Sequence, residues 1–328
     1  LALQENLEQG KQSILLLNRR GYNTFVSCRS CGYVASCPNC SISLTYHAAN
    51  GRLMCHYCGY SVPFKKECPQ CHEERMHYAG FGTQRAEDQL TSLFPEARIL
   101  RLDADTSFTK DAYEKNLEEF SRGNYDMIIG TQMVAKGLDF ENVTLVGVLS
   151  ADQTLYSEDF RSYERAFSLL TQVVGRSGRG RYAGRAIVQT FTPENEIFKL
   201  AAKQDYESFY EGEILIRKAM LYPPFSDICV VGFSGTREEI VRDASQLFLL
   251  RFGEKAKEKY AAIPLRVLQP TPAFIAKVNN KYRYKLIVKC RNTSLFREFL
   301  GELLREFSAE KRFSSVSVFA DMNPDTVL

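Results

Sequence analysis

Residues 28–71 read CRSCGYVASCPNCSISLTYHAANGRLMCHYCGYSVPFKKECPQC, and no other stretch of the chain is as informative. It holds eight of the ten cysteines as four Cys-x-x-Cys pairs: Cys28/Cys31, Cys37/Cys40, Cys55/Cys58 and Cys68/Cys71. A Cys-x-x-Cys turn lets two thiolates approach one ion from the same side, and tetrahedral zinc then needs a second pair. Eight thiolates therefore predict two closed, structural zinc sites. Redox-active pairs and an iron–sulfur cluster are the alternatives, and iron–sulfur clusters have different spacings.

The residues between the pairs indicate which pairs share an ion. Residues 41–54 (SISLTYHAANGRLM) contain two short alternating runs around Asn50-Gly51, and Asn-Gly favours the type I′ turn of a hairpin. A hairpin brings Cys37/Cys40 next to Cys55/Cys58 as a zinc ribbon, which we name the inner site. By exclusion, Cys28/Cys31 and Cys68/Cys71 form an outer site that encloses it.

This cysteine-rich module is not basic. Between Tyr22 and Tyr78, five Lys and Arg residues, three Glu residues, eight thiolates and two divalent ions leave a net charge of −2. Generic phosphate binding is therefore a poor account of the module, and a scaffold or protein-docking role is favoured. The four histidines of the chain lie in or beside it, at positions 47, 56, 72 and 77, but eight thiolates already satisfy two ions.

Composition places the chain among ordinary globular proteins. Its 328 residues suggest about two domains, with 45% hydrophobic residues, 25% charged residues and a net charge of +3. No apolar run reaches the roughly 20 residues of a membrane-spanning helix. Residues 1–11 (LALQENLEQGK) lack the basic start and apolar stretch of a signal peptide, so a reducing, cytoplasmic setting is expected. A chain that opens on Leu1 also looks cut from a longer protein.

The sequence on both sides of the module predicts one α/β domain that the module interrupts. Before it, residues 13–18 (SILLLN) form an apolar strand. After it, strands and helices alternate: strands at 98–105, 126–132, 143–152 and 185–191, helices at 110–123 and 161–180. Such alternation predicts a parallel, doubly wound sheet whose functional residues follow the carboxyl ends of its strands.

Two segments lie where such a sheet places its chemistry. Residues 130–140 (GTQMVAKGLDF) directly follow a predicted strand, and residues 172–179 (QVVGRSGR) end a predicted helix. Arg176 and Arg179 lie three residues apart on one face, and their planar, permanently charged groups suit the charge of a transferring γ-phosphoryl group. The alternative is a pair of surface arginines at a helix end, which the presence of the other segment disfavours.

The last third of the sequence predicts a separate domain. Two helical stretches in 193–220 and a helix stop at Tyr222-Pro-Pro-Phe225 lead into it. A strand (227–235), a helix (236–260), a hairpin around Asn279-Asn280 (265–278 and 281–290), a helix (293–312) and a strand (314–321) then follow in the ferredoxin-like β-α-β-β-α-β order. Cys229 and Cys290 lie in apolar strands and are expected to be inert core residues.

One strand of this domain is a candidate for nucleic-acid binding. Alternation places three basic residues on one face and two tyrosines on the other: Lys281, Arg283 and Lys285 opposite Tyr282 and Tyr284. With Lys277 and Lys289 nearby, the basic residues could follow a phosphate backbone while the tyrosines stack on bases. The competing interpretation is a half-buried strand with a solvated charged face.

Taken together, these segments resemble the PriA family of primosomal replication-restart helicases. QVVGRSGR and GTQMVAKGLDF resemble motifs VI and V of superfamily 2 helicases, and GFGTQRAEDQL (80–90) follows the four inserted Cys-x-x-Cys pairs. The resemblance implies that Arg176 and Arg179 are arginine fingers. It further implies nucleotide-binding residues (Gln172, Gly137 and Asp139) and residues at the DNA backbone (Thr131 and Gln132).

The fold implied is an α/β, RecA-like second helicase lobe with a parallel sheet, interrupted by a two-zinc module and followed by a ferredoxin-like α+β domain. We expect the lobe at 1–21 and 75–193, the zinc-binding insertion at 22–74, a helical linker at 194–225 and the last domain at 226–328. No G-x-x-x-x-G-K-[ST] loop and no DExx box occur in the sequence, so the cradle for the β- and γ-phosphates is missing. The chain resembles only the carboxyl-terminal half of the family.

The resemblance also implies a function for the complete protein. It would be an ATP-dependent 3′ to 5′ DNA helicase that restarts stalled replication forks and initiates primosome assembly, with two zinc ions, ATP and Mg²⁺. Its implied partners are branched forks and single-stranded DNA, single-stranded-DNA-binding protein, primosome proteins and the replicative helicase loader, without a membrane. The chain alone is expected to be inactive as an ATPase. The alternative is a non-enzymatic, zinc-containing nucleic-acid or protein adaptor.

Overall fold

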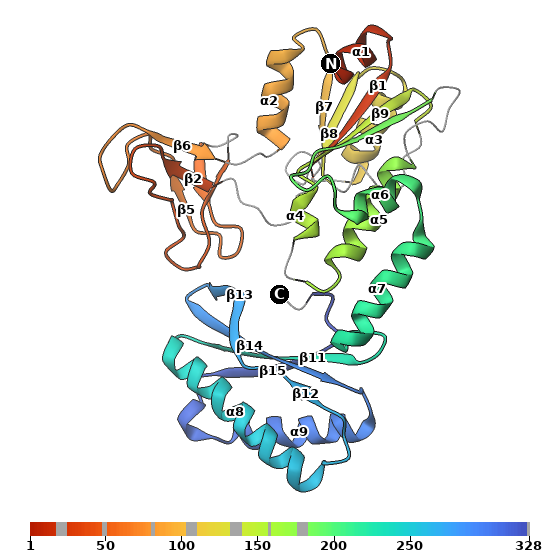
Figure 1. Cartoon of the computed structure of the whole chain (residues 1–328). Coiled ribbons are helices and arrows are strands. Elements are labelled where there is room, and N and C mark those ends of the chain that lie inside the picture. Colours follow the sequence, from red (N-terminus) through yellow and green to blue (C-terminus); the bar gives the residue numbers. More distant parts are fainter. Residues whose placement is uncertain are drawn as a thin grey trace. The chain divides into compact units, whose positions relative to one another are not determined.

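The chain divides into two compact units in a computed structural model (Figure 1). The structure describes residues 1–17, 25–47, 51–79, 83–102, 110–131, 140–156, 159–175 and 183–326. Unit 1 comprises 1–22 and 80–213, and unit 2 comprises 23–79 and 214–328. The cysteine-rich module therefore belongs to the same unit as the C-terminal domain. Within the described ranges, no helix is long and apolar enough to cross a membrane.

Unit 1 is built on a five-stranded sheet. Its strands are β1 (Gln12–Leu17), β7 (Ile99–Leu102), β8 (Met127–Gly130), β9 (Val143–Leu149) and β10 (Arg185–Val188). They lie in the order β10-β9-β1-β8-β7, and each neighbouring pair is parallel. β1 and β8 are buried along their whole length, as expected for central parallel strands covered on both faces. The predicted parallel sheet is confirmed.

Helices cover both faces of this sheet. They are α1 (Ala2–Glu8), α2 (Thr83–Leu93), α3 (Lys110–Ser121), α4 (Asp152–Leu155), α5 (Ser162–Val174), α6 (Glu196–Lys203) and α7 (Tyr206–Met220). Along β1, Ile14 and Leu16 pack into a core with α3, α5 and α6, whereas Leu15 and Leu17 pack into a second core with α1 and α2. Alternate residues of one strand thus belong to two cores.

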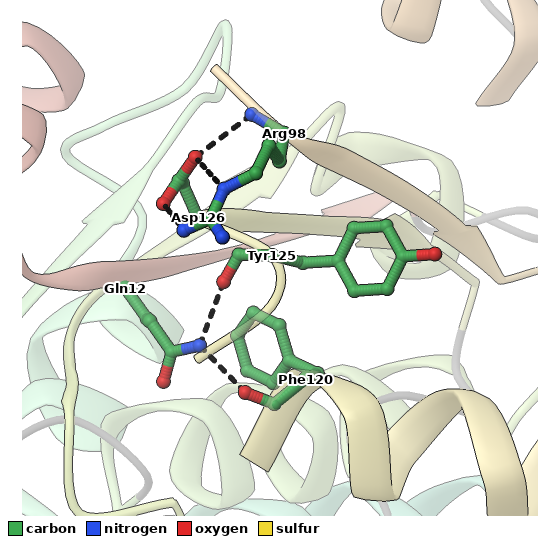
Figure 2. Close-up of polar contacts among 5 residues, drawn as sticks. All are labelled: Gln12, Arg98, Phe120, Tyr125 and Asp126. Atoms are coloured by element: carbon green, nitrogen blue, oxygen red, sulfur yellow. Dashed lines mark hydrogen bonds and ion pairs between the residues drawn. The ribbon is translucent and has the colours of Figure 1, made fainter. Parts of the chain in front are cut away.

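A polar cluster holds the amino ends of β1, β7 and β8 together (Figure 2). The side-chain amide of Gln12 donates to the backbone carbonyls of Phe120 and Tyr125 at 2.7 and 2.8 Å. The guanidinium of Arg98 donates to the Asp126 carboxylate at 2.6 and 3.1 Å. Arg98 thereby holds the pKa of Asp126 below its usual range, so this pair stabilises the fold above the ordinary aspartate pKa and loses its effect as the pH falls.

Gln12→Leu is expected to destabilise unit 1, because the apolar leucine side chain leaves the two carbonyls without their side-chain donor. A buried polar group that loses its partner costs on the order of 2 kcal/mol, which corresponds to roughly thirtyfold faster exchange of the β1 amides. Native-state hydrogen exchange measures this factor. Gln9→Leu, at an exposed position, is the control and is expected to leave the exchange rates nearly unchanged. Equal exchange rates in the two variants would contradict the structural role of Gln12.

The C-terminal part of unit 2 is an antiparallel sheet with two helices. Its elements are β11 (Asp227–Gly235), α8 (Glu238–Lys259), β12 (Arg266–Val267), β13 (Thr271–Val278), β14 (Lys281–Cys290), α9 (Ser294–Ser308), a 3₁₀ turn (Lys311–Phe313) and β15 (Ser317–Met322). The sheet order is β12-β14-β11-β15, and β13 also pairs with β14. This is the predicted ferredoxin-like arrangement. The strand predicted at 265–278 is broken around Pro270, which has no backbone N–H to donate to a neighbouring strand.

One face of this sheet is covered by α8 and α9 (Figure 1). Phe233, Phe248 and Leu303 are fully buried in the resulting core. Cys229 and Cys290 are buried in the same core, and burial raises the pKa of each thiol to about 12. The expectation that these two cysteines are core residues is confirmed.

The cysteine-rich module has a small antiparallel sheet of its own. Its strands are β2 (Phe25–Cys28), β3 (Thr45–His47), β4 (Arg52–Met54), β5 (Ser61–Pro63) and β6 (Met76–Ala79), in the order β5-β4-β3-β2-β6. β3 and β4 form the predicted hairpin, in which His47 pairs with Arg52. Gly51 has a positive φ of 63°, and the type I′ turn at Asn50-Gly51 stays a prediction. Asn50 itself lies outside the described residues.

Candidate metal centres and nucleic-acid interface

The eight thiols of the module form two groups of four. In the outer site, the Sγ atoms of Cys28 and Cys71 lie 3.6 Å apart, as do those of Cys31 and Cys68. In the inner site, which also contains Cys40 and Cys55, the Sγ atoms of Cys37 and Cys58 lie 3.6 Å apart. Within each group all four sulfurs lie within 4.8 Å of one another. The grouping is the one that the hairpin predicts.

These distances fit tetrahedral zinc. Four sulfurs at about 2.3 Å from one zinc ion lie about 3.8 Å from each other, whereas the sulfurs of a disulfide lie about 2.05 Å apart. Among the described residues, each group consists of cysteines alone, which is the ligand set of a closed structural zinc site. The metal that fits both groups is therefore zinc.

Backbone N–H groups prepare one thiol of each site for metal binding. The N–H of Cys31 lowers the pKa of Cys28 to about 6, and the N–H of Tyr60 lowers the pKa of Cys58 to about 7. Burial has the opposite effect on Cys37 and raises its pKa to about 12. The charge of a bound cation would favour ionisation of all four thiols in each site.

The described histidines of the module make other contacts. Nδ1 of His72 lies 3.2 Å from a carboxylate oxygen of Glu67, and Nδ1 of His77 lies 2.9 Å from the carbonyl oxygen of Ser27. Neither these two histidines nor His56 belongs to a thiol group. The side chain of His47 lies outside the described residues.

The first helicase-like segment begins where β8 ends, at Gly130. Thr131, predicted to contact the DNA backbone, follows directly and is half-buried. Gln132, Gly137 and Asp139 lie outside the described residues. The structure thus places the start of the segment at the carboxyl end of a central strand, where the sheet rule expects function.

The second helicase-like segment begins on the last turn of α5. Gln172 is half-buried there, and its amide donates to the hydroxyl of Ser168 at 3.1 Å. α5 ends at Val174, and Gly175 caps it. Arg176 and Arg179 lie outside the described residues, so their role as arginine fingers stays a prediction.

The predicted alternation along β14 is confirmed. Tyr282 and Tyr284 are half-buried and pack against the core beneath α8 and α9, which favours the half-buried strand over stacking of their rings on bases. Lys281, Arg283 and Lys285 therefore lie on the face of the sheet opposite to these helices.

Two further lysines that were predicted to lie near a DNA backbone bind other parts of the protein instead. Lys289 is buried, donates to the carbonyl of Met220 at 2.5 Å and lies 3.6 Å from the ring centre of Tyr222, and burial lowers its pKa. The ammonium of Lys277 donates to the carbonyl of Pro38 at 3.3 Å. Both cations thus have structural partners, which corrects the expectation that they follow a phosphate backbone.

Phe319 is an exposed aromatic residue that the sequence did not reveal. It lies on β15 with half of its surface exposed, and the sheet register aligns it with Gly232 and Lys285. A Cβ atom on residue 232 would lie 2.3 Å from the Phe319 ring, so the ring lies across the glycine. Period-two alternation on β15 could have predicted that Phe319 lies on an exposed face. That Phe319 lies opposite Gly232 follows only from the strand register.

A second unpredicted feature joins the inner site to the C-terminal sheet. The backbone N–H of Asn279 donates to Sγ of Cys40, 239 residues away in the sequence. The sequence predicts a turn at Asn279-Asn280, but no pattern of residue types predicts which residues the turn contacts.

The chain thus has a parallel α/β lobe with an inserted two-site cysteine module. Helicase-like segments follow one strand and end one helix of this lobe. These features define a helicase lobe with a zinc-binding insertion. Sequence comparison agrees: the description "Helicase conserved C-terminal domain" matches residues 72–181, "PriA DNA helicase Cys-rich region (CRR) domain" matches 37–63, and "Primosomal protein N C-terminal domain" matches 218–325. This chain belongs to the PriA family.

The matched relatives are much longer than this chain. Replication restart protein PriA of Bacillus subtilis is 43% identical over 98% of this chain and 39% of its own length. The protein of the same name from Synechocystis is 38% identical over 99% of this chain and 38% of its own length. The chain thus spans about two fifths of these relatives. Among solved structures, the C-terminal domain of the DEAD-box protein Dbp5 aligns with 66% of this chain and 88% of its own at 12% identity and a TM-score of 0.30, too low to carry an argument.

Proposed function

We propose that this chain is the second lobe, zinc module and C-terminal domain of an ATP-dependent 3′ to 5′ DNA helicase that restarts stalled replication forks and initiates primosome assembly. The observation that carries the proposal is the two-site thiol module inserted into a parallel-sheet lobe in which the QVVGRSGR segment begins on the last turn of α5. The relatives that match nearly the whole of this chain are called replication restart proteins.

In the complete protein, the lobe would supply one side of an ATP site. Arg176 and Arg179 would meet the charge that develops on the transferring phosphoryl group, while Gln172, Gly137 and Asp139 would contact the nucleotide and Mg²⁺ would come with the ATP. Thr131 and Gln132 would contact the DNA backbone. The sequence has no phosphate-binding loop, so the β- and γ-phosphates would be held by another part of the protein.

The zinc module and the C-terminal domain would supply docking and DNA contacts. Two zinc ions would hold the module, and its net charge of −2 suits docking of proteins better than docking of DNA. Candidate partners are single-stranded-DNA-binding protein, primosome proteins and the loader of the replicative helicase, in the cytoplasm. Single-stranded DNA would lie on the face of the C-terminal sheet opposite to α8 and α9, with its phosphates near Lys281, Arg283 and Lys285 and a base on Phe319.

Reversing the charge of Lys281, Arg283 and Lys285 to Glu is expected to weaken binding of single-stranded DNA. Each lost phosphate contact lowers the slope of log K against log salt by about 0.7 for single strands, so the slope is expected to fall by about 2. Fluorescence anisotropy titrations between low and high salt measure both quantities.

The control reverses three exposed basic residues on the helices and turn of the same domain, Lys257, Arg305 and Lys311. It changes the net charge by the same amount and is expected to keep the salt slope. If the β14 variant also keeps its slope, the three residues are a solvated face and not a DNA site.

A further inference from the structure

The tip of the β13–β14 hairpin lies against the inner site. At this tip Val278 pairs with Lys281, and Asn279 and Asn280 between them have positive φ angles of 48° and 59°, as in a type I′ turn. The tip contacts residues 37–41 (CPNCS), a knuckle that carries two of the four inner thiols. Hairpin and module belong to the same compact unit.

Main-chain atoms make most of this contact. The N–H of Asn280 donates to the carbonyl of Asn39 at 2.7 Å, and the N–H of Ser41 donates to the carbonyl of Lys277 at 2.8 Å. The N–H of Lys277 donates in return to the Ser41 hydroxyl at 2.8 Å. The side-chain amide of Asn280 adds a bond to the side-chain oxygen of Asn39 at 3.1 Å, and Val278 packs into the core of the module. The hairpin tip therefore pairs with the knuckle on both sides of Cys40.

The Cys40 thiol receives a hydrogen bond at the centre of this contact. The N–H of Asn279 donates to its Sγ atom at 3.2 Å. Cys40 is only 3% exposed, so water is a poor substitute for this donor. A thiolate keeps negative charge when it binds a metal, and an N–H aimed at the sulfur stabilises that charge. Partners of metal ligands commonly change metal affinity by about 10- to 100-fold.

We propose that the hairpin tip supports the inner site without binding the metal itself. Asn279, Asn280 and Ser41 are positioning residues for the Cys40 thiolate. Metal binding at the inner site and docking of the C-terminal sheet on the module are then one coupled equilibrium. Coupling between two binding events is reciprocal, so the factor by which docking tightens the metal is the factor by which the metal tightens docking. The inference rests on the proposed zinc binding by the four inner thiols.

This coupling has a consequence for the proposed DNA surface. Lys281 directly follows the tip, and Arg283 and Lys285 continue along β14. A metal ion at the inner site thus fixes where this basic row begins relative to the module. The zinc ion links the two parts of unit 2 without touching DNA.

Asn280→Gly combined with Ser41→Ala, in the full chain, tests the proposal. Glycine tolerates the positive φ of residue 280 and keeps the turn, while the two changes remove the side-chain bonds to Asn39 and Lys277. The protein is loaded with ¹¹³Cd²⁺, which binds four-thiolate sites and gives each site its own NMR signal. We expect the chelator concentration that removes half of the inner cadmium to fall about tenfold, and that for the outer cadmium to stay unchanged.

The matched control is Ser30→Ala, which removes an exposed hydroxyl from a knuckle of the outer site. It is expected to leave both signals as in the unaltered protein. The two signals are assigned with Cys71→Ser, which removes a ligand from the outer site alone.

A second measurement follows the coupling in the other direction. Hydrogen exchange of the Asn279 and Asn280 amides, observed with ¹⁵N-asparagine labelling, is expected to speed up about tenfold when the inner metal is removed. Because the coupling is reciprocal, an unchanged inner-metal midpoint in the double variant or unchanged exchange of the tip overturns the proposal. If no cadmium signal arises from the inner thiols at all, the proposed zinc site fails, and this inference fails with it.

Discussion

Serine at both Cys55 and Cys58 is expected to remove one of two zinc ions and to unfold the part of the cysteine-rich module around it. The strands there, β3, β4 and β5, are three residues long, and cysteines themselves form much of the module's core. Such a segment has little apolar surface to stabilise it without metal. A structural zinc ion contributes about 10–16 kcal/mol of apparent binding free energy, which here is folding free energy. Elemental analysis measures the zinc, and hydrogen exchange of residues 45–63 measures the unfolding.

Cys229→Ala is the matched control for this experiment. It removes a buried thiol that lies outside both four-cysteine groups, so the variant is expected to keep two zinc ions per chain. Two zinc ions remaining in the Cys55/Cys58 variant would contradict the inner site. A single zinc ion, or iron, in the unaltered chain would contradict the two-site interpretation as a whole.

Arg179→Ala in the complete protein is expected to lower the rate of DNA-stimulated ATP hydrolysis by about 10³ to 10⁵, the range typical of arginine fingers. Phosphoryl transfer needs the phosphates held on one side and the developing charge met on the other. In the proposed function this chain supplies only the second part, so alone it is expected to hydrolyse no ATP above background. Steady-state ATPase assays with and without single-stranded DNA, on this chain and on the complete protein, measure both results.

Two variants of the complete protein make this test specific. Arg179→Lys is expected to restore little activity, because an ammonium group cannot reproduce the planar fork of a guanidinium. Arg165→Ala removes a partly exposed arginine of α5, 3.7 Å from Asp159, and is expected to stay active. Hydrolysis by this chain alone, or a fully active Arg179→Ala protein, would overturn the assignment of a lobe that only completes the site.

The parts of the fold that the sequence predicts are those with local signals. The buried strands around Ile14 and Ile128 are continuous apolar runs, which a parallel sheet requires. The grouping of the eight cysteines follows from the short alternating runs on both sides of one hairpin. The hairpin between β3 and β4 likewise follows from these local runs, which pair His47 with Arg52.

The contacts that the sequence could not predict depend on distant parts of the chain. Alternation on β14 places Tyr284 and Lys285 on opposite faces of the sheet. It does not show which of these faces the helices cover, because tyrosine and lysine side chains can both be half-buried. From the sequence alone, Lys289 resembled a solvent-exposed cation. Its contacts with Met220 and Tyr222 become known only from the fold. The contact of Asn279 with the inner site is made by a backbone N–H, which every residue except proline carries, so no residue type encodes it.

The cysteine pairs of the module are nested, and nesting sets an order of assembly. Between Cys40 and Cys55 lie 14 residues, whereas between Cys31 and Cys68 lie 36. Closing the longer loop first costs about 0.8 kcal/mol more chain entropy, and closing the shorter one first brings the ends of the longer one together. The inner ion is therefore expected to bind first and to nucleate folding of the module, and the outer ion to bind second. During synthesis, the first cysteine pair to leave the ribosome would be completed last.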